Sequence, residues 1–309
     1  MGTFAIPDDF TQTQIEVHGA AGLAWLDRLP AILDACALRW GLTLGPPFPH
    51  LSYNYAAPAV RADGMPVVVK ACTPSGEFPE FPLESAALRV YDGRGAARLL
   101  AVDPADQVML LERLEPGTPL LTLEDDEEAV GIAAGVMRAL WRPVPPDHPF
   151  PSVADWGRGF ARLRRRYDGG SGPFPSALVA EAERLFGELT ASADAPVVLH
   201  GDLHHHNILA AGSRGWLAID PKGLVGEPAY EVGAFLRNRL PQPLPNREAG
   251  RITARRIDLF AMELGIERAR LRGWALAQAV LSAWWSLEDH GHGWEPMVGL
   301  AELVAAIKE

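Results

Sequence analysis

The stretch of sequence that most constrains this chain runs from Val197 to Asn238. It reads VVLHGDLHHHNILAAGSRGWLAIDPKGLVGEPAYEVGAFLRN. Short apolar runs alternate with polar loops, which predicts three short strands. The second and third strands are expected to form a hairpin around Gly212 to Gly215. Such a hairpin would bring together three polar residues that stand at strand ends: Asp202, Asn207 and Asp220.

These three residues have the types and spacing that phosphoryl transfer requires. The reaction needs a carboxylate to position or deprotonate the attacking hydroxyl, and oxygen ligands to hold Mg²⁺ on a triphosphate. His200, Asp202 and Asn207 reproduce the spacing of a kinase catalytic loop, and Asp220 follows at a hairpin's distance. Singly, each residue reads as a loop or cap residue. Jointly they predict Asp202 as the catalytic carboxylate, with Asn207 and Asp220 as the magnesium ligands.

Histidines surround the predicted catalytic carboxylate. We expect His200 to order the loop, because an imidazole can bridge two backbone groups. The run of His204, His205 and His206 also admits a zinc site, and with it a zinc hydrolase. Adjacent histidines on a tight loop rarely converge on one metal, and the chain lacks an HExxH pair. Zinc is therefore the weaker alternative.

The first third of the chain has the pattern of a small sheet with one helix. Short runs rich in Val, Leu and Ile predict strands at Met65 to Lys70, Ala97 to Val102 and Gln107 to Arg113. The turn composition of residues 103–106 predicts an antiparallel hairpin between the last two. A helix is expected within residues 81–95, with Pro82 in its first turn and Gly93 at its stop.

A lysine and a glutamate of this region form a predicted ion pair. Lys70 closes a Val-rich strand, and Glu84 lies on the helix face expected to pack on the sheet, where a carboxylate requires a partner. Paired with Glu84, the Lys70 ammonium would point toward the α- and β-phosphates of ATP. The alternative is a lysine and a glutamate that both face water.

A glycine-rich phosphate loop is missing from the sequence, which contains neither GxGxxG nor GxxxxGK[ST]. Residues 45–59, which precede the Val-rich strand, offer Ser52 and Asn54 in its place. The contacts to the phosphates are therefore left unassigned.

The rest of the chain has a mainly helical pattern. Residues 115–117 suit a hinge, and Thr122 followed by acids at 124–128 suits a capped helix start. Helices are also expected at Leu259 to Leu271 and Trp274 to Leu287. This change in composition divides the chain into a sheet-rich part, residues 1–113, and a mainly helical part, residues 114–309, that contains the predicted catalytic loop.

Charge and composition limit the classes of partner. The net charge of −11 argues against a nucleic-acid binder and accommodates a metal or a cationic small molecule. Two cysteines, Cys36 and Cys72, suit a reducing compartment. The N-terminus lacks the pattern of a signal peptide, and no apolar run reaches 18 residues, so we expect a cytoplasmic protein without a membrane partner. The oligomeric state is left open.

The loop HGDLHHHN and the segment WLAIDPKGLVGEPAYE resemble the aminoglycoside phosphotransferase family, in its streptomycin 6-kinase and hydroxyurea kinase branch. The likeness extends to ESAALRVYDGRGAARLL, LLERLEPG and LSAWWSLEDHG, and so covers the chain from about Lys70 onward. It implies an α+β, protein-kinase-like fold of two lobes. Residues 1–113 would be a nucleotide-binding N-lobe, a small antiparallel sheet of five strands with a helix. Residues 114–309 would be a mainly helical C-lobe with the substrate-binding helices. The implied activity is ATP-dependent phosphorylation of a small-molecule hydroxyl, such as the 6-position of streptomycin, and the implied biological role is antibiotic resistance.

The resemblance also implies binding residues. Backbone groups of Glu112 and Leu114 would contact adenine, and the acceptor side would include four acids, Glu227, Glu231, Glu288 and Asp289. His206 departs from the small or acidic residue that relatives often carry before the asparagine. Three alternatives stay open: a kinase of another metabolite, a kinase of hydroxyurea, and a non-catalytic nucleotide-binding protein. The intact Lys70, Asp202, Asn207 and Asp220 argue against the last.

Overall fold

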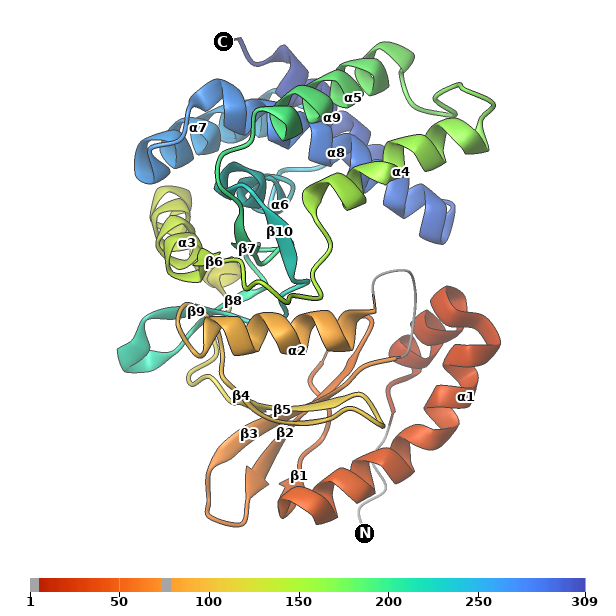
Figure 1. Ribbon diagram of the computed structural model, residues 1–309, viewed down its shortest axis with the longest axis vertical. Coiled ribbons are helices and arrows are strands. Elements are labelled where there is room, and N and C mark those ends of the chain that lie inside the picture. Colours follow the sequence, from red (N-terminus) through yellow and green to blue (C-terminus); the bar gives the residue numbers. More distant parts are fainter. Residues whose placement is uncertain (1–5, 50, 74–78, 309) are drawn as a thin grey trace.

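The computed structural model describes residues 6–49, 51–73 and 79–308. Figure 1 shows a sheet lobe below a helical lobe. The sheet has five antiparallel strands in the order β1-β2-β3-β5-β4. Their bounds are Leu42–Leu44 (β1), Tyr55–Arg61 (β2), Pro66–Ala71 (β3), Leu99–Asp103 (β4) and Val108–Glu112 (β5). The two-lobed α+β fold predicted from the sequence is confirmed, including the hairpin of β4 and β5.

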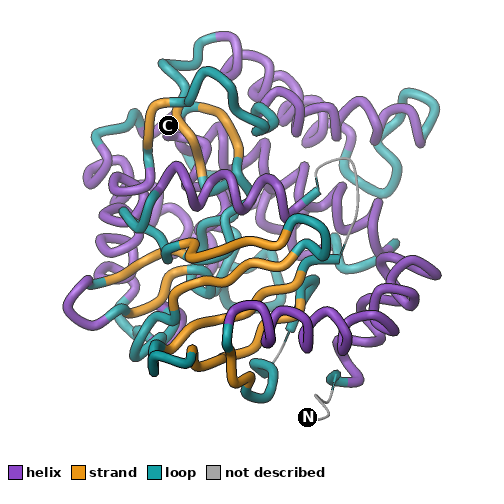
Figure 2. The backbone as a smooth tube through the Cα atoms, turned by 60° about the horizontal axis from the view of Figure 1, so that its bottom comes forward, coloured by secondary structure: helices purple, strands orange, loops and turns teal. Residues whose placement is uncertain are grey.

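Each face of the sheet is covered by a helix, because successive strand residues point to opposite sides. Val67, Val69 and Ala71 of β3 pack on α1 (Asp8–Trp40), whereas Val68 packs in the core that includes α2 (Glu80–Tyr91). Figure 2 shows the strands as one sheet with helices on both sides. Lys70 shares the side of Val68, so its position in the strand directs it toward α2.

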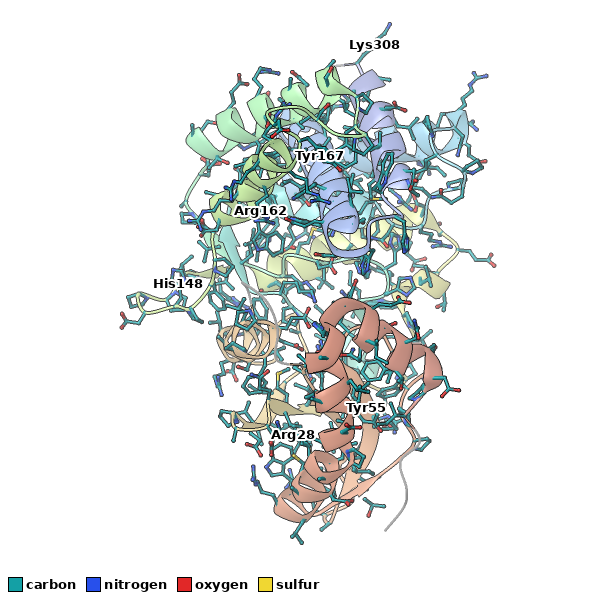
Figure 3. The ribbon with its side chains drawn as sticks, turned by 90° about the vertical axis from the view of Figure 1, so that its right-hand side faces the viewer. Arg28, Tyr55, His148, Arg162, Tyr167 and Lys308 are labelled. Atoms are coloured by element: carbon teal, nitrogen blue, oxygen red, sulfur yellow. The ribbon has the colours of Figure 1, made fainter. Side chains whose placement is uncertain are left out.

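The expectation of a single helix in the first third of the chain is wrong, because α1 precedes the sheet. Figure 3 shows this helix lying along the sheet lobe beside Tyr55. The helix bends at Gly19 (φ 56°, ψ −133°), and Pro30 lies within it. Because the bend divides the apolar residues into two segments, no continuous helical period spans residues 8–40. Across the described part of the chain, no helix has the length and apolar character that a membrane crossing requires.

The helical lobe contains longer helices than the sequence predicted. Its α-helices are Asp126–Leu140 (α3), Val153–Arg166 (α4), Ser176–Ala191 (α5), Val232–Leu236 (α6), Arg247–Leu264 (α7), Arg268–His290 (α8) and Glu295–Ala306 (α9). The expected helix from Leu259 to Leu271 is wrong, since Gly265 ends α7 in the left-handed conformation. Gly273, which falls between the two expected helices, lies inside α8 and leaves space for Leu189. Helix α3 is capped by Asp125, whose side chain accepts hydrogen bonds from the N–H groups of Glu127 and Glu128. The cap is therefore not Thr122, the residue that the sequence suggested.

Five short strands at the junction of the lobes position the predicted catalytic loop. They are Arg142–Pro143 (β6), Val197–Leu199 (β7), Ile208–Ala210 (β8), Trp216–Ala218 (β9) and Leu224–Gly226 (β10). The expected hairpin is confirmed as β8 paired with β9. Ala218 accepts the N–H of Ala97 at 2.8 Å and donates its own N–H to Gly95 at 2.8 Å. These two hydrogen bonds attach the hairpin to the segment that follows α2.

Candidate active site

The loop from His200 to Asn207 follows β7 and is held by buried side chains. The carboxylate of Glu231 accepts the N–H of His200 at 2.7 Å and that of Gly201 at 2.9 Å. Burial lowers the pKa of His200 to about 4, so its ring is neutral. With Nε2 placed 2.8 Å from the Ile219 carbonyl and Nδ1 3.2 Å from the Asp202 N–H, the ring bridges the loop to the end of β9.

Asp202, Asn207 and Asp220 meet at the end of this loop and of the β8–β9 hairpin. Asn207 Nδ2 donates to the Asp202 carbonyl at 3.0 Å, which leaves the amide oxygen as an acceptor for a cation. Asp220 follows β9 with a left-handed φ of 64°, which turns its side chain back to the junction of the lobes. One amide oxygen and one carboxylate fit Mg²⁺, which takes few protein ligands and keeps its remaining positions for water and phosphate oxygens.

Lys70 connects the sheet lobe to this group. Its Nζ lies 2.6 Å from Glu84 Oε2 and also contacts Asp220 Oδ1. Burial would lower the pKa of Lys70, but Asp220 and Glu84 raise it well above its usual range. Burial also raises the pKa of Asp220, and the ammonium groups of Lys70 and Lys222 outweigh it, so that its pKa falls below the usual range. The site therefore holds a charged lysine between two acids.

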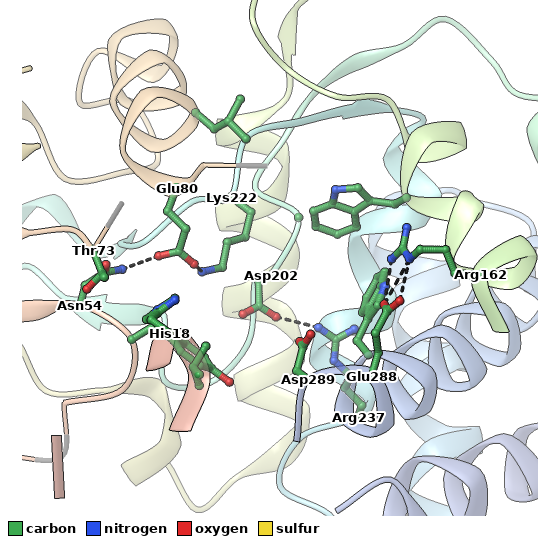
Figure 4. Close-up of a pocket in the computed structure, with 16 residues that line it drawn as sticks. His18, Asn54, Thr73, Glu80, Arg162, Asp202, Lys222, Arg237, Glu288 and Asp289 are labelled. Carbon is green, nitrogen blue, oxygen red and sulfur yellow. Dashed lines mark hydrogen bonds and ion pairs between the residues drawn. The ribbon is translucent and has the colours of Figure 1, made fainter. Parts of the chain in front are cut away.

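A cavity of about 760 Å³ opens beside Asp202 (Figure 4). Both lobes line it, including α1 through Val17 and His18 and the C-terminal end of α8 through Glu288 and Asp289. Trp156 and Trp285, whose rings stand edge to face at 5.4 Å, form part of its wall. The cavity therefore places an aromatic and polar surface next to the predicted catalytic carboxylate.

Ion pairs neutralise most of the charged groups that line the cavity. Figure 4 shows three of them. They are Arg237 with Asp202 at 2.7 Å, Lys222 with Glu80 at 2.5 Å and Arg162 with Glu288 at 2.9 Å. Asp289 has no such ion pair among the described residues, and burial together with Glu288 raises its pKa. Asp289 is therefore the acid of the cavity wall that is best placed to form an ion pair with a cationic group of a ligand.

Two of the acids expected on the acceptor side lie elsewhere. Glu227 is buried, with its carboxylate 2.6 Å from Arg270 and in contact with Trp274 Nε1. Glu231 is buried under the catalytic loop, and burial raises its pKa to about 7. Neither lines the cavity, so the expectation of substrate contact is corrected for both: their carboxylates complete internal hydrogen bonds.

The predicted adenine-binding residues lie at the end of β5 and just after it. The N–H of Glu112 donates to the Arg98 carbonyl at 3.0 Å, so this group is already used, and its side chain pairs with Arg214. Leu114 is buried with Ala97 and Leu217. Within the described ranges, the main-chain groups of Leu114 have no hydrogen-bond partner. Leu114 is therefore the better placed of the two for a base.

The three adjacent histidines have different surroundings. His204 Nε2 lies 3.5 Å from Asp202 Oδ2, His205 is buried with its ring stacked 3.9 Å from that of Phe235, and His206 is exposed. Sequence reasoning missed Glu80, Lys222 and Arg237, which lie in the cavity wall. For Lys222 a signal was available, because it follows Asp220 in the segment IDPKG.

A small antiparallel sheet stacked on a helical lobe, with a lysine–glutamate pair facing a catalytic loop, is the architecture of protein-kinase-like small-molecule kinases. Residues 53–290 match the family model described as aminoglycoside/hydroxyurea antibiotic resistance kinase. The chain belongs to this family and is a small-molecule phosphotransferase.

Relatives and solved structures agree with this assignment. The chain is 33% identical to streptomycin 6-kinase of Streptomyces glaucescens, over 94% of each chain. It is 33% identical to hydroxyurea phosphotransferase of Kitasatospora aureofaciens, over 92% of this chain and 81% of the relative. The fold is similar to that of aminoglycoside phosphotransferase APH(4)-Ia, solved with ADP and hygromycin B. That similarity has a TM-score of 0.63 at 17% identity and covers 89% of this chain and 99% of the other.

Proposed function

We propose that this kinase phosphorylates a hydroxyl of a cationic aminocyclitol of the streptomycin type. The observation that carries the proposal is the cavity beside Asp202, in which Asp289 has no ion pair among the described residues. A protonated amine or guanidinium of the acceptor would supply that missing charge. Trp156 and Trp285 line the same cavity, and aromatic rings of this kind attract cations. The names of two relatives, the streptomycin 6-kinases of Streptomyces glaucescens and Streptomyces griseus, support the same class of acceptor.

The size of the cavity favours a large acceptor over hydroxyurea. A volume of about 760 Å³ lies within the usual range of about 300–1,000 Å³ for sites that enclose drug-sized ligands. Hydroxyurea would leave most of this space to water and could not reach Asp202 and Asp289 together with the tryptophan wall. Hydroxyurea is therefore one arm of the test rather than a second proposal.

In the proposed mechanism the two lobes, residues 1–113 and 114–309, hold the nucleotide between them. Leu114 contacts the adenine, and Lys70 neutralises charge on the α- and β-phosphates. Asn207 and Asp220 would hold magnesium, which would supply positive charge to the phosphate oxygens.

Asp202 orients the acceptor hydroxyl and receives its proton. The acceptor oxygen forms a bond to the γ-phosphorus while the bond to the bridging oxygen breaks, and the electron pair of that bond leaves with ADP. Burial raises the pKa of Asp202, but His204, at 3.5 Å, and Arg237, at 2.7 Å, outweigh it and hold that pKa below its usual range. Because the transition state is loose, alignment contributes more than basicity.

Phosphate transfer from labelled ATP to a panel of acceptors tests the proposal. The panel contains streptomycin, hygromycin B and hydroxyurea, and the position of the phosphate is read by NMR. We expect transfer to the 6-hydroxyl of streptomycin, and a loss of about 10³-fold or more in Asp202→Asn. Transfer to hydroxyurea alone would overturn the acceptor. Normal activity in Asp202→Asn would overturn the role of this carboxylate.

A further inference from the structure

Lysine is rare in this chain, and its positions are informative. Of the 28 basic residues only three are lysines, namely Lys70, Lys222 and Lys308. Surface ion pairs are made by arginine, as in Arg184 with Glu181 and Glu188. Two of the three lysines nevertheless lie at the junction of the lobes. An ammonium is a compact point charge, whereas a guanidinium is a planar fork, so a retained lysine indicates a place where the compact charge is required.

Lys222 is fixed by its surroundings at the catalytic loop. Its N–H donates to the His200 carbonyl at 2.8 Å, and it follows Asp220 by two positions. Its Nζ lies 2.5 Å from Glu80 Oε1, and Glu80 also accepts a bond from Asn54 Nδ2. The side chain is 26% exposed and lines the cavity together with Asp202. Figure 4 shows Asn54, Glu80, Lys222 and Asp202 in succession across the cleft.

Lys222 lies next to the acids on both sides of the reaction. It follows Asp220 by two positions in the chain, and its side chain lines the same cavity as Asp202. Asp220 lies on the nucleotide side and Asp202 on the acceptor side of the proposed mechanism. The group that passes between nucleotide and acceptor is the γ-phosphoryl group. Because Lys222 is close to Asp220 in the chain and shares the cavity with Asp202, its ammonium is placed along that path.

We propose that Lys222 contacts the transferred phosphoryl group and neutralises the charge that develops on its oxygens. The side chain would do the work that an arginine supplied within the same chain does in other phosphoryl transferases. Lys70 acts on the α- and β-phosphates, so the two lysines divide the triphosphate between them. In a chain without a glycine-rich loop, Lys222 adds positive charge at the end of the triphosphate. Glu80 holds the ammonium in place until the nucleotide binds.

A structural role is the competing explanation. Glu80 begins α2 in the sheet lobe and Lys222 belongs to the helical lobe, so their ion pair also joins the lobes. If joining the lobes were the only role, loss of either partner would have the same effect. If Lys222 contacts phosphate, its loss would weaken the binding of nucleotides that carry a γ-phosphate and leave ADP binding unchanged. Loss of Glu80 would not have this selective effect.

The test compares nucleotides with and without a γ-phosphate and needs no acceptor. Affinities for magnesium AMP-PNP and magnesium ADP are measured by calorimetry in Lys222→Met, Lys222→Arg and Glu80→Gln. Lys308→Met is the matched control, because this exposed lysine lies at the far end of the helical lobe (Figure 3). Acceptor-free ATP hydrolysis and thermal unfolding are recorded for each protein. The inference rests on the proposed mechanism but not on the acceptor, so failure of the acceptor assignment would leave this test intact.

We expect Lys222→Met to weaken AMP-PNP binding about tenfold or more while ADP affinity stays within about threefold. ATP hydrolysis should fall about 10²- to 10³-fold in the same protein. Lys222→Arg keeps the charge but not its compact shape, so it should recover only part of the AMP-PNP affinity. Glu80→Gln should keep the preference for AMP-PNP over ADP. The inference would be overturned if Lys222→Met lost affinity for AMP-PNP and ADP equally, or if Glu80→Gln showed the same selective loss as Lys222→Met. Either result would favour a structural role in which the ion pair only holds the two lobes together.

Discussion

Lys70 Nζ lies 2.6 Å from Glu84 Oε2, and both side chains are at least nine-tenths buried between the sheet and α2. Burial raises the pKa of Glu84 to about 7, against the opposing effect of Lys70. The same ammonium contacts Asp220 from the other lobe. The pair therefore fixes the direction of Lys70 from one side while leaving its nitrogen directed at Asp220.

Replacing Glu84 by Gln should release Lys70 toward Asp220. We expect the KM for ATP to rise about tenfold. The Lys70 ammonium would then pair more tightly with Asp220, the carboxylate that is proposed to hold magnesium. Steady-state kinetics with varied ATP measures the effect. Glu188→Gln is a suitable control, since Glu188 forms an exposed pair with Arg184. An unchanged KM in Glu84→Gln would contradict the role given to this pair.

Replacing Asp289 by Asn should weaken acceptor binding selectively. The change removes the charge that the proposed cationic acceptor would meet, so the KM for streptomycin should rise about tenfold while the KM for ATP stays the same. Asp258→Asn provides a control on an exposed acid that pairs with Arg268. A matching rise in the KM for ATP would show that the substitution disturbs the site as a whole.

Replacing Glu227 by Gln should lower stability rather than acceptor affinity. The buried carboxylate pairs with Arg270 at 2.6 Å, and its loss leaves that guanidinium without its charged partner. We expect the free energy of unfolding to fall by about 2 kcal/mol, measured by urea denaturation. The KM for the acceptor should not change. A higher KM at unchanged stability would restore Glu227 to the acceptor side.

His200 should make stability depend on pH below neutrality. Its pKa is lowered from the ordinary value of 6.5 to about 4 in the folded protein, chiefly by burial. Between these values the unfolded chain binds more protons at this position, so its contribution to stability is present above pH 6.5 and is lost as pH falls toward 4.

The slope attributable to this histidine is at most about 1.4 kcal/mol per pH unit. Glu84 and Glu231, with pKa values raised to about 7, titrate nearby with the opposite sign. Urea denaturation of His200→Gln and the unaltered protein, compared from pH 7 to pH 5, isolates the histidine. Equal slopes in the two proteins would contradict the neutral, buried ring.

Local sequence patterns predicted the structure correctly where residues that are close in sequence are also close in space. The hairpins β4–β5 and β8–β9 could be predicted because short turns separate strands that pair directly. Helix α1 could not, because a bend at Gly19 interrupts its apolar period. The role of Glu231 could not be predicted either, since its partners, His200 and Gly201, lie about 30 residues earlier in the chain.

By itself the sequence determined the candidate residues for phosphoryl transfer, because a carboxylate, an amide and a second carboxylate stand at the spacing of a kinase catalytic loop. Only the tertiary structure decided which other charges surround them. Glu227 turned inward to Arg270, whereas Arg237 and Lys222 turned toward the cavity. Long-range packing fixes whether a charged side chain meets water, a ligand or a buried partner, and residue type alone does not specify that packing.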